Sequence, residues 1–130
     1  MKFRYEDLEI WQRALELIRS VYDVLKRFPK DERYDLISQG KRVVVSIALN
    51  IAERSGRKID KDFSLFINRA ITSLQEVDGV VKIGLKLRYI SEKDYNGVAH
   101  LLEKEYFKLI AFDKTLIRDH SKRKRYVDKN

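Results

Sequence analysis

The sequence contains no cysteine, which excludes disulfide bonds and thiolate metal sites. A single proline and five glycines leave few forced breaks, so we expect long secondary-structure elements. The longest strongly apolar run, residues 43–49, is far shorter than the roughly 20 residues that cross a bilayer. The first residues are charged and lack the apolar core of a signal peptide. These absences predict a cytoplasmic protein that does not insert into a membrane.

The composition is that of a folded, basic protein. The 130 residues suffice for one domain with its own core, and 44% of them are hydrophobic. Lysine and arginine number 28 against 20 acidic residues, which gives a formal net charge of +8. Such an excess attracts polyanions and speeds their capture. The composition is therefore compatible both with nucleic-acid binding and with an ordinary basic surface.

Apolar residues recur at helical spacing in four segments, near residues 8–28, 32–54, 60–88 and 91–119. Pro29 ends the first segment, and Ser91 with Asp94 resembles a capping box before the fourth. Because the connections are short, successive helices must be antiparallel neighbours. The pattern predicts an all-α, up-down-up-down four-helix bundle over residues 1–120. Residues 121–130 lose the periodicity and predict a disordered, basic tail.

The second segment is apolar around more of its circumference than a single bundle requires. Besides the side that faces the core, Val45, Leu49 and Ala52 widen its apolar arc to roughly 240°, whereas a surface helix needs little more than about 100°. Off-stripe apolar residues in the third segment add to this surface. The predicted contact residues between copies of the chain are Val45, Leu49, Ala52, Leu65, Ile83 and Leu87. We therefore predict a homo-oligomer.

A polar stripe follows the second segment at spacings of three and four residues. It consists of Gln39, Arg42, Ser46, Asn50 and Glu53. Such a row can fix the register of packed helices through hydrogen bonds, or it can hold a ligand. The first interpretation is favoured, because a catalytic pair needs neighbours that tune its pKa values and the sequence does not show them.

No recognised catalytic motif accompanies the stripe. His100 and His120 have no histidine or carboxylate partner at a metal-ligating spacing. Gly40-Lys41 lacks the preceding glycine and the following hydroxyl of a phosphate loop, and Ser46 lacks the flanking glycines of a hydrolase nucleophile. We predict no catalytic residue, no metal and no cofactor.

A basic cluster is the second candidate site, and it surrounds the connection between the second and third segments. Its members, with the tail included, are Lys41, Arg42, Arg54, Arg57, Lys58, Lys61, Lys122, Arg123, Lys124 and Arg125. Neutralising phosphates with such groups releases counterions, so binding should weaken steeply with salt. Aromatic residues that could stack on bases are scarce there, which favours recognition of the backbone or shape of RNA. An oligomer would repeat the cluster and amplify weak contacts.

Many positions of the sequence together match the pattern of a known family, most strongly around the second helix. These positions are residues 3–14 (FRYEDLEIWQRA), Phe28-Pro29, Glu32, Tyr34, Leu36, Gln39, Ser46-Ile47, Asn50-Ile51-Ala52-Glu53, Gly56-Arg57, Phe66, Ala70, Ser73-Leu74, Glu76, Tyr89-Ile90 and Tyr95. Over about residues 3 to 118, the sequence thus resembles the four-helix-bundle proteins encoded in intervening sequences of bacterial 23S ribosomal RNA genes.

The resemblance implies a bundle that assembles as a ring, typically a homopentamer, with no established enzymatic activity and an association with RNA. A related branch, the accessory variability determinants of diversity-generating retroelements, implies an alternative in which a reverse transcriptase is the partner. The chain departs from the family pattern where Arg54, Thr72 and Arg88 replace frequent glycines. These replacements add charge and affect positions where the backbone would approach closely.

Overall fold

The computed structural model describes the backbone of residues 1–55 and 63–129 and the side chains of residues 1–54 and 65–114. A short 3-10 helix, η1 (Arg4–Asp7), precedes α1 (Glu9–Leu25), and a second, η2 (Lys30–Glu32), precedes α2 (Leu36–Ser55). The remaining helices are α3 (Phe63–Lys86) and α4 (Glu92–Lys129). Within these ranges the chain contains no strand, and the predicted all-α four-helix fold is confirmed.

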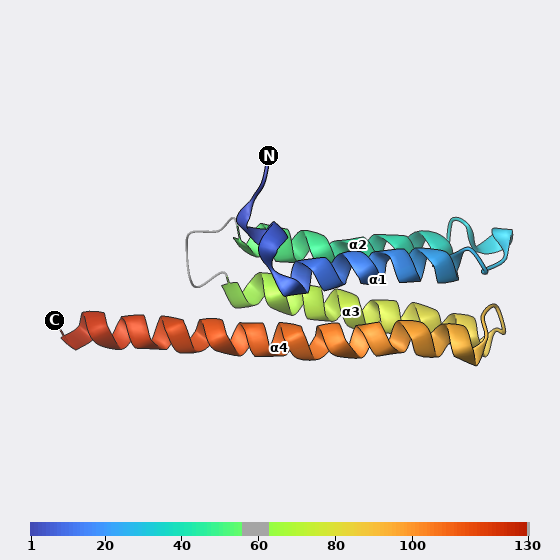
Figure 1. Cartoon of the computed structure of the whole chain (residues 1–130). Coiled ribbons are helices and arrows are strands. Elements are labelled where there is room, and N and C mark those ends of the chain that lie inside the picture. The colour runs from blue at the N-terminus through green and yellow to red at the C-terminus, as the bar shows by residue number, and fades with distance from the viewer. Residues whose placement is uncertain (56–62, 130) are drawn as a thin grey trace.

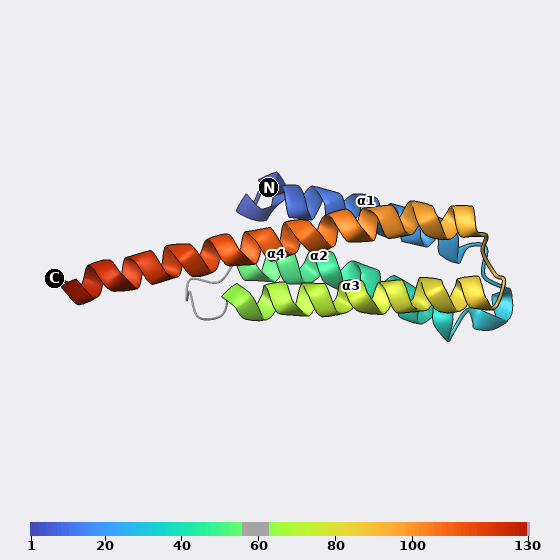
Figure 2. The ribbon, with the colours of Figure 1, turned by 90° about the horizontal axis from the view of Figure 1, so that it is seen from below.

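The four helices alternate in direction (Figures 1 and 2). Each helix packs against the helices before and after it, and α1 also packs against α4, which closes the bundle. The α1–α2 and α3–α4 connections meet at one end of the bundle, while α4 extends beyond the other end (Figure 1). The arrangement follows from the short connections, which leave each helix no partner closer than its neighbour in sequence.

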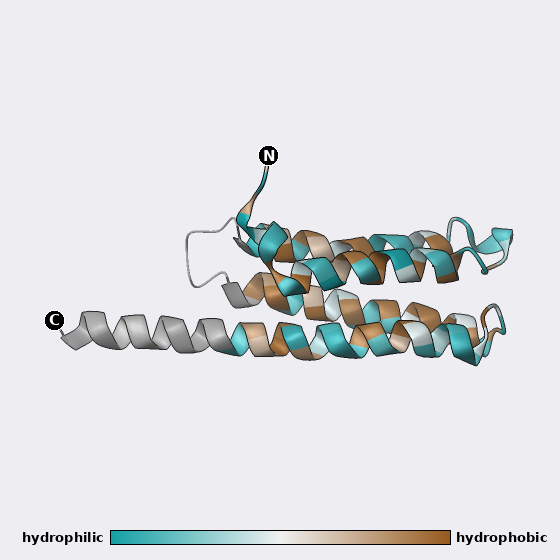
Figure 3. Ribbon diagram, viewed as in Figure 1, coloured by the Kyte–Doolittle hydropathy of each residue, from teal (hydrophilic) through white to brown (hydrophobic). Residues whose placement is uncertain are grey.

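Apolar bands along all four helices turn inward and make a single core (Figure 3). Two glycines make room in this core for side chains at the end of α1 and in the connection that follows it. A Cβ atom on Gly40 would lie 2.9 Å from a methyl group of Leu25, and one on Gly84 would collide with the ring of Phe28. Each glycine is therefore a notch, filled in one case by Leu25 of α1 and in the other by Phe28 of the α1–α2 connection.

The end of α3 is closed by a Schellman motif. The N–H of Tyr89 donates to the carbonyl of Gly84 (2.9 Å), and the N–H of Arg88 donates to that of Leu85 (3.0 Å). Arg88 occupies the left-handed position of this motif, with φ of 64°, where glycine is usual. Of the three positions at which the sequence departs from a frequent glycine of the family, residue 88 is thus one at which the backbone favours glycine.

The helix ends test the boundaries expected from sequence. The predicted capping box is confirmed, since the Asp94 N–H donates to the Ser91 hydroxyl (3.1 Å) and the Ser91 N–H to the Asp94 carboxylate (3.2 Å). α2 begins later than residue 32 because η2 intervenes, and Glu32 accepts from the Leu36 N–H (3.3 Å).

The structure also differs from the prediction at the end of α4, where a helical backbone replaces the expected disordered tail. The helix continues to Lys129 instead of ending near residue 119. The apolar periodicity stops there, but residues 115–129 contain neither proline nor glycine, and lysine and arginine are good helix formers. Loss of core-facing residues removes packing partners without removing helix propensity.

Candidate nucleic-acid and assembly interface

The outward sides of α2 and α3 carry large apolar side chains that the single chain does not cover. The exposed fractions are 60% for Leu49, 45% for Leu65, 46% for Ile83 and 50% for Leu87. These four residues were all singled out from the sequence. The other two, Val45 and Ala52, are half-buried beside them on α2. We call these six residues the α2–α3 apolar face.

The polar stripe of α2 does not form one cluster. The Ser46 hydroxyl hydrogen-bonds with the Ser73 hydroxyl of α3 (2.5 Å) and with the Val43 carbonyl (2.8 Å), and the Asn50 amide donates to the Ser46 carbonyl (2.8 Å). Both residues are partly buried where α2 meets α3. The other three members, Gln39, Arg42 and Glu53, are exposed. Two motif positions from separate helices, Ser46 and Ser73, are thus joined directly.

The basic residues predicted to contact phosphates are spread along the bundle. Lys41 and Arg42 are exposed on α2, whereas Arg54 lies about 18 Å further along that helix at 1.5 Å per residue. Arg54 is half-buried, and its guanidinium carbon lies 4.9 Å from the centroid of the Phe112 ring of α4. Arg54 therefore packs across two helices instead of projecting freely into solvent.

The other predicted phosphate contacts cannot be placed beside these residues. Three of them, Arg57, Lys58 and Lys61, lie outside the described residues. The backbone of α4 carries Lys122, Arg123, Lys124 and Arg125, whose side chains are also outside the described set.

Sequence reasoning missed a buried carboxylate in α4. Glu105 is fully buried, and neither of its oxygens has a hydrogen-bond partner among the residues described. Burial raises the pKa of Glu105 to about 8; Arg13 opposes the rise, and the charges of Glu9 and Glu16 add to it. Arg13 forms no hydrogen bond with Glu105, whose two oxygens are unpartnered, and its Nε atom lies 2.9 Å from Glu9. Spacing offered a signal, since residue 105 falls on the core stripe of α4.

A second group that sequence reasoning missed is a set of cations at the α1–α2 end of the bundle. Lys26, Lys30 and Arg33 come from the end of α1 and the connection that follows it, and Lys41 from α2 joins them around a pocket. Lys26, Lys30 and Arg33 follow a helical spacing in the sequence, but Pro29 interrupts the helix between them, so the spacing alone does not show that they surround a pocket. Only the folded connection brings the four side chains together.

Two further findings concern only the part of the chain that the structure describes. No group of three or more histidine, aspartate or glutamate side chains there is placed to hold a metal ion. No helix in that part combines the length and apolarity needed to span a membrane.

The fold and these surfaces define the class as an antiparallel four-helix bundle with apolar residues exposed on two adjacent helices. The family model described as "23S rRNA-intervening sequence protein" matches residues 6–111, which is most of the chain. The chain therefore belongs to the 23S rRNA-intervening sequence protein family, as the resemblance indicated. The match does not favour the alternative of a retroelement accessory subunit. No curated protein matches the chain.

Proposed function

We propose that this protein is a non-enzymatic, RNA-associated bundle that works in the cytoplasm as a homo-oligomeric ring of five subunits. The observation that carries the proposal is the α2–α3 apolar face. Large exposed apolar side chains on adjacent elements are typical of surfaces that bind another protein. A second copy of the chain is the simplest partner, because the ring then covers the same face on every subunit.

The association with RNA is supported by charge. The chain has a formal net charge of +8, and Lys41 and Arg42 are exposed without a salt bridge to any described residue. A ring repeats these cations on each subunit, so that individually weak phosphate contacts add up over one RNA molecule. The family's description, which refers to ribosomal RNA, agrees with an RNA partner.

Native mass measurement tests the assembly. We expect a wild-type mass of five chains at micromolar concentration, and a shift to monomer in Leu49→Glu and in Ile83→Glu because each variant places a charge on the apolar face. The matched control is Leu15→Glu, which changes an exposed leucine on α1 outside this face. A wild-type protein that is monomeric, or an assembly that both variants leave intact, contradicts the proposal.

Filter binding with structured RNA over a range of salt concentrations tests the association with RNA. We expect binding at low salt, and we expect the logarithm of the binding constant to fall linearly with the logarithm of the salt concentration. The slope should be smaller for Arg42→Gln than for wild type. Lys104→Gln, a change of an exposed cation on α4, serves as the control. Binding that is insensitive to salt, or absent at low salt, would overturn the association with RNA.

A further inference from the structure

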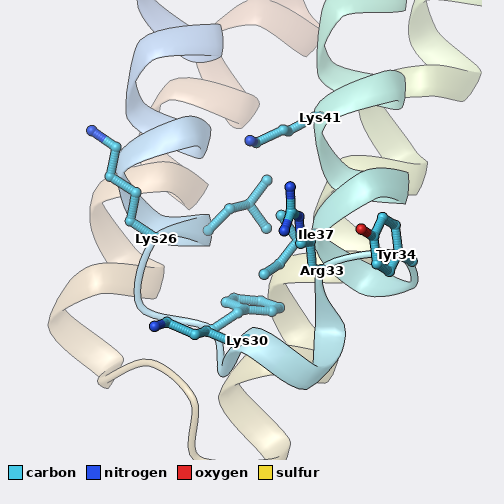
Figure 4. Close-up of a pocket in the computed structure, with 8 residues that line it drawn as sticks. Lys26, Lys30, Arg33, Tyr34, Ile37 and Lys41 are labelled. Atoms are coloured by element: carbon cyan, nitrogen blue, oxygen red, sulfur yellow. The ribbon is translucent and has the colours of Figure 1, made fainter.

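The α1–α2 connection and the start of α2 surround a pocket at one end of the bundle (Figure 4). Its volume is about 600 Å³, which falls within the range of small-molecule sites. Leu25, Phe28 and Ile37 supply apolar side chains to its lining, and the remaining lining residues are cationic apart from Tyr34. The pocket therefore combines an apolar floor with a polar rim.

The apolar floor of the pocket is held in place by packing against other parts of the bundle. Phe28 fills the notch at Gly84 and lies 5.3 Å, between ring centroids, from Tyr89. Leu25 fills the notch at Gly40. Because both side chains are buried against other helices, the floor exists before any ligand arrives, and little ordering is required on binding.

The rim carries charge of one sign. Four cations, Lys26, Lys30, Arg33 and Lys41, line the pocket, and no carboxylate does. Of the four, only Lys26 has an acidic partner among the described residues, Asp23 at 3.5 Å. A concave surface of this kind concentrates its field and attracts anions.

One carboxylate of the connection, that of Glu32, is held elsewhere. Glu32 accepts hydrogen bonds from the hydroxyl of Tyr89 (3.2 Å) and from the N–H of Leu36 (3.3 Å). These contacts tie its carboxylate to the α3–α4 connection and the start of α2. The cations of the rim therefore keep their charge available for a ligand.

An exposed aromatic ring completes the rim. Tyr34 is 81% exposed, and the guanidinium of Arg33 lies 5.2 Å from its ring centroid. Neither side chain is part of the hydrophobic core. A planar ring beside a planar cation is the arrangement on which nucleic-acid bases stack, and stacking is open only to bases that are not already paired.

We propose that this pocket binds a nucleotide unit of single-stranded RNA, with a phosphate among Lys30, Arg33 and Lys41 and the base against Tyr34. The inference rests on the proposed RNA association and adds to it a base-stacking site, at the end of the bundle where the α1–α2 connection lies. It also specifies a preference for unpaired RNA, which phosphate contacts alone do not create.

Fluorescence anisotropy with a labelled single-stranded oligoribonucleotide, and with the same strand in a duplex, tests the pocket in the full-length protein. We expect Tyr34→Ala to weaken single-strand binding by about tenfold, with duplex binding unchanged, because it removes one stacking contact. The matched control is Phe107→Ala, which removes an exposed ring from α4. Arg33→Gln should weaken binding of both RNAs and reduce the salt slope.

The outcomes separate this inference from the proposal on which it rests. If wild type binds RNA and Arg42→Gln reduces binding, but Tyr34→Ala and Arg33→Gln do not, the pocket assignment is wrong and the RNA association stands. If wild type binds neither RNA at low salt, both fail. Displacement of the oligonucleotide by an equal concentration of inorganic phosphate would show a plain anion site and overturn the nucleotide assignment. Native mass of each variant shows whether assembly is retained.

Discussion

Replacing Glu105 by glutamine should stabilise the protein at neutral pH and remove a large part of its sensitivity to alkali. Glu105 is fully buried in α4, and its raised pKa of about 8 shows that the folded state favours the protonated form. In the unfolded chain the same carboxyl ionises near its ordinary value of 4.5. The folded protein therefore holds a proton that the unfolded protein has lost, over the whole interval between these two values.

The sign and size of the effect follow from this difference. Below pH 4.5 the carboxyl is neutral in both states and costs nothing. Each pH unit above that value lowers the free energy of unfolding by about 1.4 kcal/mol until the folded pKa is reached. At pH 7 the penalty is about 3 kcal/mol, and it levels off above pH 8. A glutamine of similar shape is neutral throughout and escapes this penalty.

Urea unfolding followed by circular dichroism, at one protein concentration and at several pH values from 5 to 9, measures the effect. We expect the stability difference between Glu105→Gln and wild type to be small at pH 5 and to grow with pH. Glu103→Gln, an exposed change two positions away on the same helix, should show no such growth. Parallel pH profiles for wild type and Glu105→Gln would refute the reasoning.

Three further substitutions test the backbone of the fold by the same unfolding assay. Arg88→Gly should stabilise by about 1 kcal/mol because it relieves a left-handed residue, while Arg88→Ala, which keeps the strain, should not; equal effects of the two would contradict this. Gly84→Ala should destabilise by about 1–3 kcal/mol by colliding with Phe28, whereas Gly79→Ala, whose Cβ meets open space, should stabilise slightly. A reversed order would disprove the notch. Ser91→Ala should cost about 1 kcal/mol by removing the cap of α4, and no loss would show that the hydroxyl does not cap it.

The bundle could be predicted from sequence because its signals are local and strong. Helical periodicity, one proline and short connections determine four antiparallel helices. The surplus of apolar residues on the second helix likewise predicts that Leu49 is exposed, and the off-stripe residues predict the same for Ile83. These inferences need only the angle between successive residues of a helix.

The pocket and the lack of a partner for Glu105 could not be predicted in this way. Lys30 and Lys41 approach each other through a turn whose path depends on Phe28 entering the notch at Gly84. Spacing places residue 105 on the core stripe of α4, but the absence of a hydrogen-bond partner for its carboxylate depends on side-chain packing, which periodicity does not determine. The polar stripe was predicted as a row, but the partner of Ser46 is Ser73 on another helix, and only packing brings these two hydroxyls together.

The fit of Phe28 and Leu25 against Gly84 and Gly40 links pairs of positions that are far apart in the chain. A side chain can be added at either glycine only if the facing residue becomes smaller, so we expect each pair to covary among relatives. Since Phe28 and Leu25 also form the floor of the pocket beside the α1–α2 connection, such an exchange would reshape that pocket as well. Divergence in the hydrophobic interior and divergence in ligand preference would then occur together.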